Sequence, residues 1–160
     1  MCKEDAMKEL EDLRLIADKK RIECDIDAKA YSICLADLVP ANIILVVGGA
    51  ILSLVAGASL LTEQEIINKQ TAGVLALISS GFTIIHTKLN CDQYQAECKR
   101  FKSLYEGLSE DYANLETEST VEDFRSNLKA LNNERTQVKK GAGADPSVKS
   151  INEAKKLFNA

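Results

Sequence analysis

Residues 38–62 read LVPANIILVVGGAILSLVAGASLLT, and residues 70–87 read QTAGVLALISSGFTIIHT. The first stretch has 25 residues and no ionisable side chain; the second has 18 residues, of which only His86 can titrate. At about 1.5 Å of rise per residue they would form helices of roughly 37 and 27 Å, while the hydrocarbon core of a bilayer is about 30 Å thick. The two stretches therefore predict a membrane hairpin.

The rest of the chain is polar and typical of helices. The whole chain of 160 residues has only two prolines, Pro40 and Pro146, and no regularly spaced turn signals that would bound short strands. We expect an all-α protein with long cytoplasmic extensions and a small helical C-terminal domain. Its four parts are an N-terminal helix (1–37), the two-span hairpin (38–87), a heptad helix (88–118) and a basic helical region (119–160).

The distribution of charge predicts how the hairpin is oriented. The short segment between the stretches forces antiparallel neighbours, so both termini lie on one side. Basic residues flank the hairpin on that side, whereas the loop carries only Lys69. The flanking cations are Lys20, Arg21, Lys29, Lys88, Lys99, Arg100 and Lys102. The positive-inside rule places both termini in the cytoplasm. Five scattered cysteines fit a reducing compartment. We expect no cleaved signal peptide, because no apolar segment follows Met1.

Small residues recur every four positions in both stretches. These are Gly49, Ser53 and Gly57 in the first, and Ala72, Ala76 and Ser80 in the second. Such stripes let helix backbones approach closely in a membrane. They fit either an oligomeric bundle, with a pore that hydroxyls could line, or packing of the two helices within one hairpin. The absence of charge inside both stretches argues against an ion-coupled transporter.

A heptad pattern follows the second stretch. Apolar residues alternate spacings of three and four at Cys91, Tyr94, Cys98, Phe101, Tyr105, Leu108, Tyr112 and Leu115. This seam predicts that the second stretch continues as one helix into the cytoplasm and packs in a helical bundle. Its expected partner is the N-terminal helix, with apolar positions at Met7, Leu10, Leu13, Ile16, Ile22, Ile26 and Ile33. Pro40 is expected to kink the passage into the first stretch.

Residues 120–160 hold eight basic and five acidic residues, a net charge of +3 in a chain of −4. Ser119 to Glu122 fits a capping box, Gly141 to Pro146 reads as a linker, and Asp145 with Pro146 is expected to open a final helix. Cations and glycines beside a helix start suit phosphate. The candidate nucleotide-binding residues are Asn132, Asn133, Arg135, Lys139, Lys140, Gly141 and Ser147. A plain helix–linker–helix explains the same residues.

No catalytic pattern is present in the sequence, so we do not expect an enzyme. His86 is the only histidine and has no cysteine or histidine partner at metal-ligand spacing, so we expect it to be structural. We also expect no metal, no cofactor and no duplex nucleic acid.

The architecture resembles the SLATT domains, two-span membrane effectors of bacterial nucleotide-signalling conflict systems. The resemblance rests on Pro40 entering the first stretch and on the run Arg100-Phe101-Lys-Ser-Leu104-Tyr105-Glu-Gly-Leu108 after the second, and it covers about residues 10–116. The whole chain is also similar to small two-span ancillary effectors of type III CRISPR systems, which bind cyclic oligoadenylate in an oligomer.

Both resemblances imply an antiviral effector of the bacterial inner membrane. It would form a homo-oligomer in the lipid bilayer, and a cyclic nucleotide such as cyclic oligoadenylate would gate it to depolarise or permeabilise the membrane. Two alternatives remain open from the residues themselves. One is a holin-like or structural hairpin that needs no ligand, and the other is a soluble helical bundle that buries both stretches.

Overall fold

The structure, a computed structural model, describes residues 3–61, 67–118 and 120–158, and within these ranges it contains helices and no strand. The prediction of an all-α protein is confirmed. In chain order the elements are α1 (Lys3–Ile43), the π-helical segment η1 (Ile44–Gly48), α2 (Gly49–Leu61), α3 (Lys69–Lys88), α4 (Cys91–Asn114), the 3₁₀ segment η2 (Leu115–Thr117), α5 (Val121–Lys140) and α6 (Val148–Phe158).

The chain divides into two compact units. The bundle unit contains residues up to 35 together with residues from 96 onward, and the hairpin unit contains residues 36–95. The four-part division expected from the sequence stays a prediction.

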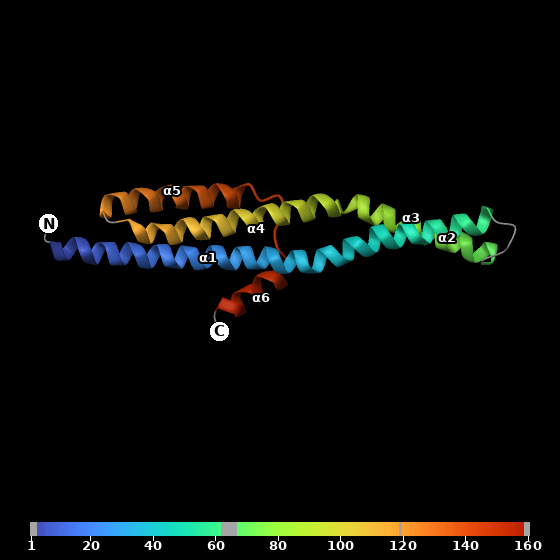
Figure 1. Ribbon diagram of the computed structural model, residues 1–160, viewed down its shortest axis with the longest axis horizontal. Coiled ribbons are helices and arrows are strands. Elements are labelled where there is room, and N and C mark those ends of the chain that lie inside the picture. The colour runs from blue at the N-terminus through green and yellow to red at the C-terminus, as the bar shows by residue number, and fades with distance from the viewer. Residues whose placement is uncertain (1–2, 62–66, 119, 159–160) are drawn as a thin grey trace. The chain divides into compact units, whose positions relative to one another are not determined.

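The core of the bundle unit is the predicted heptad seam of α4. Its last six members are buried, and they are Cys98, Phe101, Tyr105, Leu108, Tyr112 and Leu115. Tyr31 of α1 stacks on Phe101 and Tyr105, with ring centroids 5.8 and 5.9 Å apart. Stacked aromatic pairs contribute beyond their buried area, so this cluster fixes α1 against α4 (Figure 1).

The face that α1 buries differs from the predicted one. Its buried positions include Ala17, Cys24, Ala28, Tyr31 and Cys34. Among the larger apolar residues expected there, Met7, Ile16 and Ile22 are exposed, so that part of the prediction is wrong. Small residues leave room for the wide aromatic side chains of α4, and a search for large apolar residues overlooks them.

Helix α5 lies along α4 in the bundle unit (Figure 1) and buries Phe124 and Leu128. Its N-cap is Thr120, whose hydroxyl accepts a 3.2 Å hydrogen bond from the Asp123 backbone N–H and donates to the Asp123 carboxylate at 2.6 Å. Ser119, the predicted first residue of the capping box, lies outside the described residues. The cap is therefore a threonine N-cap formed by the following residue, and Asp123 accepts from the Thr120 hydroxyl, whereas the third helical residue of a capping box accepts from the cap's backbone N–H.

The predicted linker before the final helix is confirmed, because residues 141–147 are not helical. The predicted start of that helix is wrong. Helix α6 begins at Val148, and the Ser147 hydroxyl accepts a 3.1 Å hydrogen bond from the Ser150 N–H. Serine forms such a cap readily, so the residue after Pro146 replaces Asp145 as the cap.

In the hairpin unit, α1 passes through η1 into α2. Pro40 lies inside α1 and does not end it. Proline removes one backbone donor and crowds the carbonyl four residues earlier. The wider turns of the π-helical segment η1 begin four residues later, and the helix continues through them into α2.

Helix α3 returns beside α2 (Figure 1). Its N-cap is Asn68, whose side chain accepts a 3.0 Å hydrogen bond from the Gln70 N–H. Most of the predicted loop, residues 63–66, lies outside the described residues. The helix ends at Lys88, and Asn90 has a φ of 46° before α4 begins. The expectation of one helix from the second stretch into the heptad is therefore wrong, since left-handed backbone breaks a helix.

Among the residues that the structure describes, one helix, Ala6–Ser59, is long and apolar enough to cross a membrane, and only 6% of its most apolar 18-residue window is buried. A second span is counted only if α3 and the following helix, bent by 41° at their junction, are taken together. The structure thus supports one or two candidate membrane-spanning helices.

Candidate functional site

Five hydroxyl groups of the hairpin unit donate hydrogen bonds to backbone carbonyls. The Ser79 hydroxyl of α3 donates a 2.7 Å hydrogen bond to the carbonyl oxygen of Gly49 at the start of α2. Four other hydroxyls donate to the carbonyl four residues earlier in the same helix, and they belong to Ser59, Ser80, Thr83 and Thr87. These bonds satisfy polar groups without water, as an apolar solvent requires.

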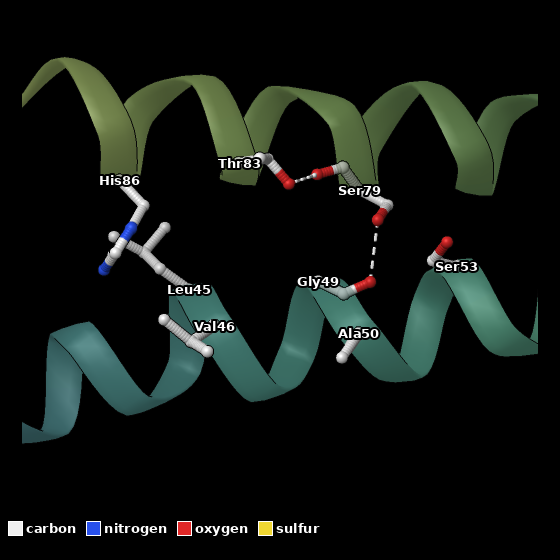
Figure 2. Close-up of a pocket in the computed structure, with 8 residues that line it drawn as sticks. All are labelled: Leu45, Val46, Gly49, Ala50, Ser53, Ser79, Thr83 and His86. Carbon is white, nitrogen blue, oxygen red and sulfur yellow. Dashed lines mark hydrogen bonds between the residues drawn. The ribbon is translucent and has the colours of Figure 1, made fainter.

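A groove of about 340 Å³ lies between the two apolar helices of the hairpin unit. Figure 2 shows Ser53 and Ser79 at one end and His86 at the other. Its lining residues are Leu45, Val46, Gly49, Ala50, Ser53, Ser79, Thr83 and His86. Four of the eight lining residues are apolar, three carry hydroxyls, one is His86, and none is an Asp, Glu, Lys or Arg. The groove therefore suits an apolar chain or another helix better than a charged ligand.

A polar cluster closes the end of the hairpin unit near His86. The Asn42 side-chain amide donates hydrogen bonds to Asp92 Oδ1 at 2.7 Å and to Gln95 Oε1 at 3.2 Å. His86 Nε2 lies 3.4 Å from Asp92 Oδ2, a separation of an electrostatic contact rather than of a well-formed hydrogen bond. The Asn42 hydrogen bond, more than His86, holds the pKa of Asp92 below its usual value. The cluster joins α1, α3 and α4, in keeping with the structural role expected for His86.

The predicted small-residue stripes divide between two environments. Gly49 and Ala72 are buried, and Gly49 is close to Phe82 and to the Ser79 carbonyl. In contrast, Ser53, Ala76 and Ser80 are exposed, and no side chain would meet a Cβ added at Gly57 within 4 Å. The first group therefore packs within one hairpin. The second group is available for contact with another molecule, so an oligomeric bundle stays a prediction.

Two of the seven candidate nucleotide-binding residues take part in the packing of the bundle unit. The Asn132 side-chain oxygen accepts a 2.9 Å hydrogen bond from the Tyr112 hydroxyl. Arg135 pairs with Glu23 at 2.7 Å and with Asp27 at 3.5 Å. A ligand that used either residue would have to displace these partners.

The other five candidates lie along the end of α5 and the linker. Asn133, Lys139, Lys140, Gly141 and Ser147 are exposed. Gly141 caps α5 with a φ of −83° and not in the left-handed region, and Ser147 caps α6. The structure therefore leaves Lys139 and Lys140 as the cations that a solvent-borne anion reaches directly. A nucleotide site here stays a prediction.

Sequence patterns missed the ionic contacts between α1 and α5. Burial raises the pKa of Asp27, although the charge of Arg135 opposes this. Burial also acts to raise the pKa of Glu23, but hydrogen bonds from Lys20 and Arg135 outweigh it and lower the value. Asp25 accepts a 2.6 Å hydrogen bond from Ser109 of α4. The one sequence feature that could have predicted these contacts is the set of three acidic residues at positions 23, 25 and 27, because they lie on a helix that is expected to pack against another.

Among the described residues, no three His, Cys, Asp or Glu side chains gather as they would around a metal ion. Comparisons of the chain with family models, curated proteins and solved structures find no match. The resemblances drawn from the sequence therefore stay predictions, and the functional argument rests on the two units themselves.

Proposed function

We propose that this protein is a homo-oligomeric membrane effector. In this proposal its hairpin unit crosses a bilayer twice, its bundle unit lies in the cytoplasm, and its assembly perturbs the membrane barrier. One observation carries the proposal: the hairpin unit exposes many large apolar side chains, while five of its hydroxyls donate to backbone carbonyls within the unit. Exposed members include Ile44, Val46, Val47, Ile51, Leu54, Val74, Leu77, Ile78, Ile84 and Ile85.

In a water-soluble hairpin the large apolar side chains would be buried and polar ones exposed, whereas here the large apolar side chains are exposed. A soluble protein seldom exposes a contiguous apolar surface of this extent, whereas lipid is the solvent that favours it. The uncovered part of the small-residue stripes consists of the exposed Ser53, Ala76 and Ser80 with the half-buried Gly57, and it supplies a surface on which a second hairpin could pack. Both features support insertion together with self-association.

Insertion is tested by carbonate extraction of membranes from cells that express the full chain. We expect the protein to remain in the membrane pellet. Orientation is tested with Lys69→Cys in a Cys2→Ser, Cys91→Ser background, against Cys91 in a Cys2→Ser background. An impermeant maleimide added to intact spheroplasts should label the former and spare the latter. Labelling of both or neither from outside contradicts a two-span hairpin with cytoplasmic termini.

A soluble assembly is the second candidate, because copies of the protein could bury the same apolar faces against one another. The large exposed apolar surface is compatible with this reading too, and the hydroxyls that bond to backbone carbonyls inside the hairpin unit are what favour lipid over it. Release of the protein by carbonate as a defined soluble oligomer would establish it and overturn insertion.

We further propose that a cyclic nucleotide gates the effector. The accessible pair Lys139 and Lys140, beside the linker, supports this part, and an antiviral role rests on the resemblance alone. Dye release from proteoliposomes should rise when cyclic oligoadenylate is added, and Lys139→Glu with Lys140→Glu should abolish the rise while cross-linked oligomers persist. Equal release by both proteins without ligand would instead establish the holin-like alternative.

A further inference from the structure

Ser53 of α2 carries a hydroxyl for which the hairpin unit supplies no acceptor. Its side chain is exposed and lines the groove, and within the described residues it makes no hydrogen bond. Figure 2 shows Ser53 beside the bond from Ser79 to Gly49, with no bond of its own. Among the described serines and threonines of the hairpin unit, the other without a hydrogen bond is Thr71, in the first turn of α3.

The packing of α3 on α2 explains why Ser53 lacks a partner. A serine in a helix usually donates to the carbonyl four residues earlier, which for Ser53 is the carbonyl of Gly49. That oxygen already accepts the 2.7 Å bond from Ser79 and, in an α-helix, the bond from the backbone N–H of Ser53 itself. A carbonyl oxygen has two lone pairs, so both are in use. The contact between the two helices therefore occupies the acceptor that Ser53 would otherwise use.

Ser53 also lies far from both ends of the first uncharged stretch. It follows Leu38 by 15 residues and precedes Thr62 by 9, which in a helix correspond to about 23 and 14 Å. In an inserted hairpin the hydroxyl is thus inside the hydrocarbon, where an unpaired polar group is costly and neither water nor an acyl chain accepts its bond. An acceptor on another protein helix removes that cost.

The side chains around Ser53 leave room for such a helix. The groove beside it is lined by Gly49 and Ala50, whose small size lets a backbone approach closely. The next residue, Leu54, is 75% exposed but does not line the groove, since consecutive residues point to different sides of a helix. At this depth α2 therefore has a hollow on one side and a bulky aliphatic surface on another.

We propose that α2 of a second copy of this chain packs into the groove about a two-fold axis, so that the two Ser53 hydroxyls meet and one donates to the other. This inference rests on the proposed insertion and self-association of the hairpin unit. Inserted copies share one orientation, so identical residues lie at the same depth, and in a two-fold contact each residue near the axis meets its counterpart. A second copy is favoured over a lipid acyl chain because the acyl chain offers the hydroxyl no acceptor.

A disulfide across the proposed axis tests the contact. Ser53→Cys is placed in the full chain with Cys2→Ser and Cys91→Ser, and membranes that contain it are oxidised with copper phenanthroline. We expect a dimer on a non-reducing gel. Leu54→Cys in the same background is the matched control, because it has the same depth but lies outside the groove, and it should stay monomeric.

The hydrogen bond is tested separately, by energy transfer in phosphatidylcholine vesicles. The full chain in a Cys2→Ser background is labelled on Cys91 with donor or acceptor dye, and dilution with lipid gives the dissociation constant. Ser53→Ala should weaken association about threefold, the factor for an average hydrogen bond between helices in a membrane. Ser80→Ala is the matched control and should leave the constant unchanged, because exposed Ser80 bonds to Ala76 of its own helix. Ser53→Leu should abolish energy transfer by filling the groove.

Each contrary result has a distinct meaning. A disulfide at Leu54→Cys alone, or equal yields at both positions, overturns the contact at the groove. The same holds when neither position is oxidised to a dimer although energy transfer persists, because the copies then associate through another face. An unchanged dissociation constant in Ser53→Ala overturns the hydrogen bond. All of these leave the proposed function intact, whereas absence of energy transfer at every protein-to-lipid ratio contradicts the proposed self-association itself.

Discussion

Single residues determine how α5 is held on α1, and two arginines of α5 allow a matched comparison. Arg135 is 18% exposed and bonds Glu23 and Asp27, while Arg125 is 60% exposed and pairs with Glu9. Arg135→Gln should destabilise the bundle unit by about 1–3 kcal/mol, because a partly buried carboxylate loses its partner. Arg125→Gln should change stability by less than about 1 kcal/mol.

Guanidine unfolding of the full chain in detergent, followed by circular dichroism, measures both values. Equal effects of the two substitutions would show that burial of Arg135 does not strengthen its ion pairs.

Buried acids of the core predict how stability depends on alkaline pH. Burial raises the pKa of Cys24 from 9.0 to about 11, and raises the pKa of Tyr105 and Tyr112 from 10.0 to about 12. The folded state therefore holds these protons more tightly than the unfolded chain does. The stabilisation is complete below about pH 9 and is lost as pH rises through the window from 9 to about 12.

Unfolding midpoints should accordingly fall steeply above about pH 9. The tyrosinate absorbance of the folded protein should lag behind that of the protein in guanidine. Coincident titration curves for folded and unfolded protein would contradict burial of these hydroxyls.

At the scale of elements, the break between α3 and α4 depends on one backbone conformation. Asn90 has a φ of 46°, which asparagine and glycine tolerate and β-branched residues do not. Asn90→Val should therefore destabilise the junction by about 1–2 kcal/mol, whereas Asn90→Gly should be nearly neutral. Thermal unfolding in detergent compares the two, and an equal loss in both would attribute the effect to the Asn90 side chain.

The packing of α2 on α3 depends on the absence of a side chain at Gly49. A Cβ there would lie 3.6 Å from the Phe82 Cβ, whereas nothing lies within 4 Å of one at Gly57 or Gly81. Gly49→Leu should overpack the contact and destabilise the hairpin unit by about 1–3 kcal/mol. Gly81→Leu is the control and should leave the unfolding temperature nearly unchanged.

Gly57→Leu tests self-association at the same time. It should leave the unfolding temperature of the monomer unchanged but reduce the yield of cross-linked oligomer, since the half-buried Gly57 has open space beside it on the stripe. Undiminished cross-linking would remove the exposed stripe from the oligomer contact.

The buried face of one helix, α4, could be predicted from the periodicity of its apolar residues alone. The heptad pattern correctly predicted the residues buried between Cys98 and Leu115, because large aromatic residues at spacings of three and four make the periodicity easy to recognise. The break at Asn90 could not be predicted, since asparagine is compatible with a helix interior. The buried face of α1 was also missed, since its alanines and cysteines carry little hydrophobic signal and are selected by the shape of their partners. The candidate nucleotide-binding residues were chosen by charge, which does not distinguish Arg135, an arginine paired inside the bundle, from Lys140 in solvent.

At the scale of the whole molecule, the two units should respond differently to denaturant. The bundle unit is stabilised by aromatic burial and ion pairs, which guanidine weakens. The hairpin unit, if embedded in lipid, keeps its backbone hydrogen bonds because no water competes for them. In nanodiscs at intermediate guanidine, amides of α4 and α5 should exchange with deuterium while those of α2 and α3 remain protected. Simultaneous exchange of all four helices would indicate that the hairpin is solvated.

The contrast between η1 and Asn90 gives the hairpin two unlike connections. Through η1 the backbone stays helical from α1 into α2, so a rotation of α1 about its axis would also rotate α2. At Asn90 the helical backbone is interrupted, so a rotation of α4 would change the backbone dihedrals at Asn90 before it rotated α3. Rotation of α1 would thus turn α2, whereas rotation of α4 would leave α3 largely unturned.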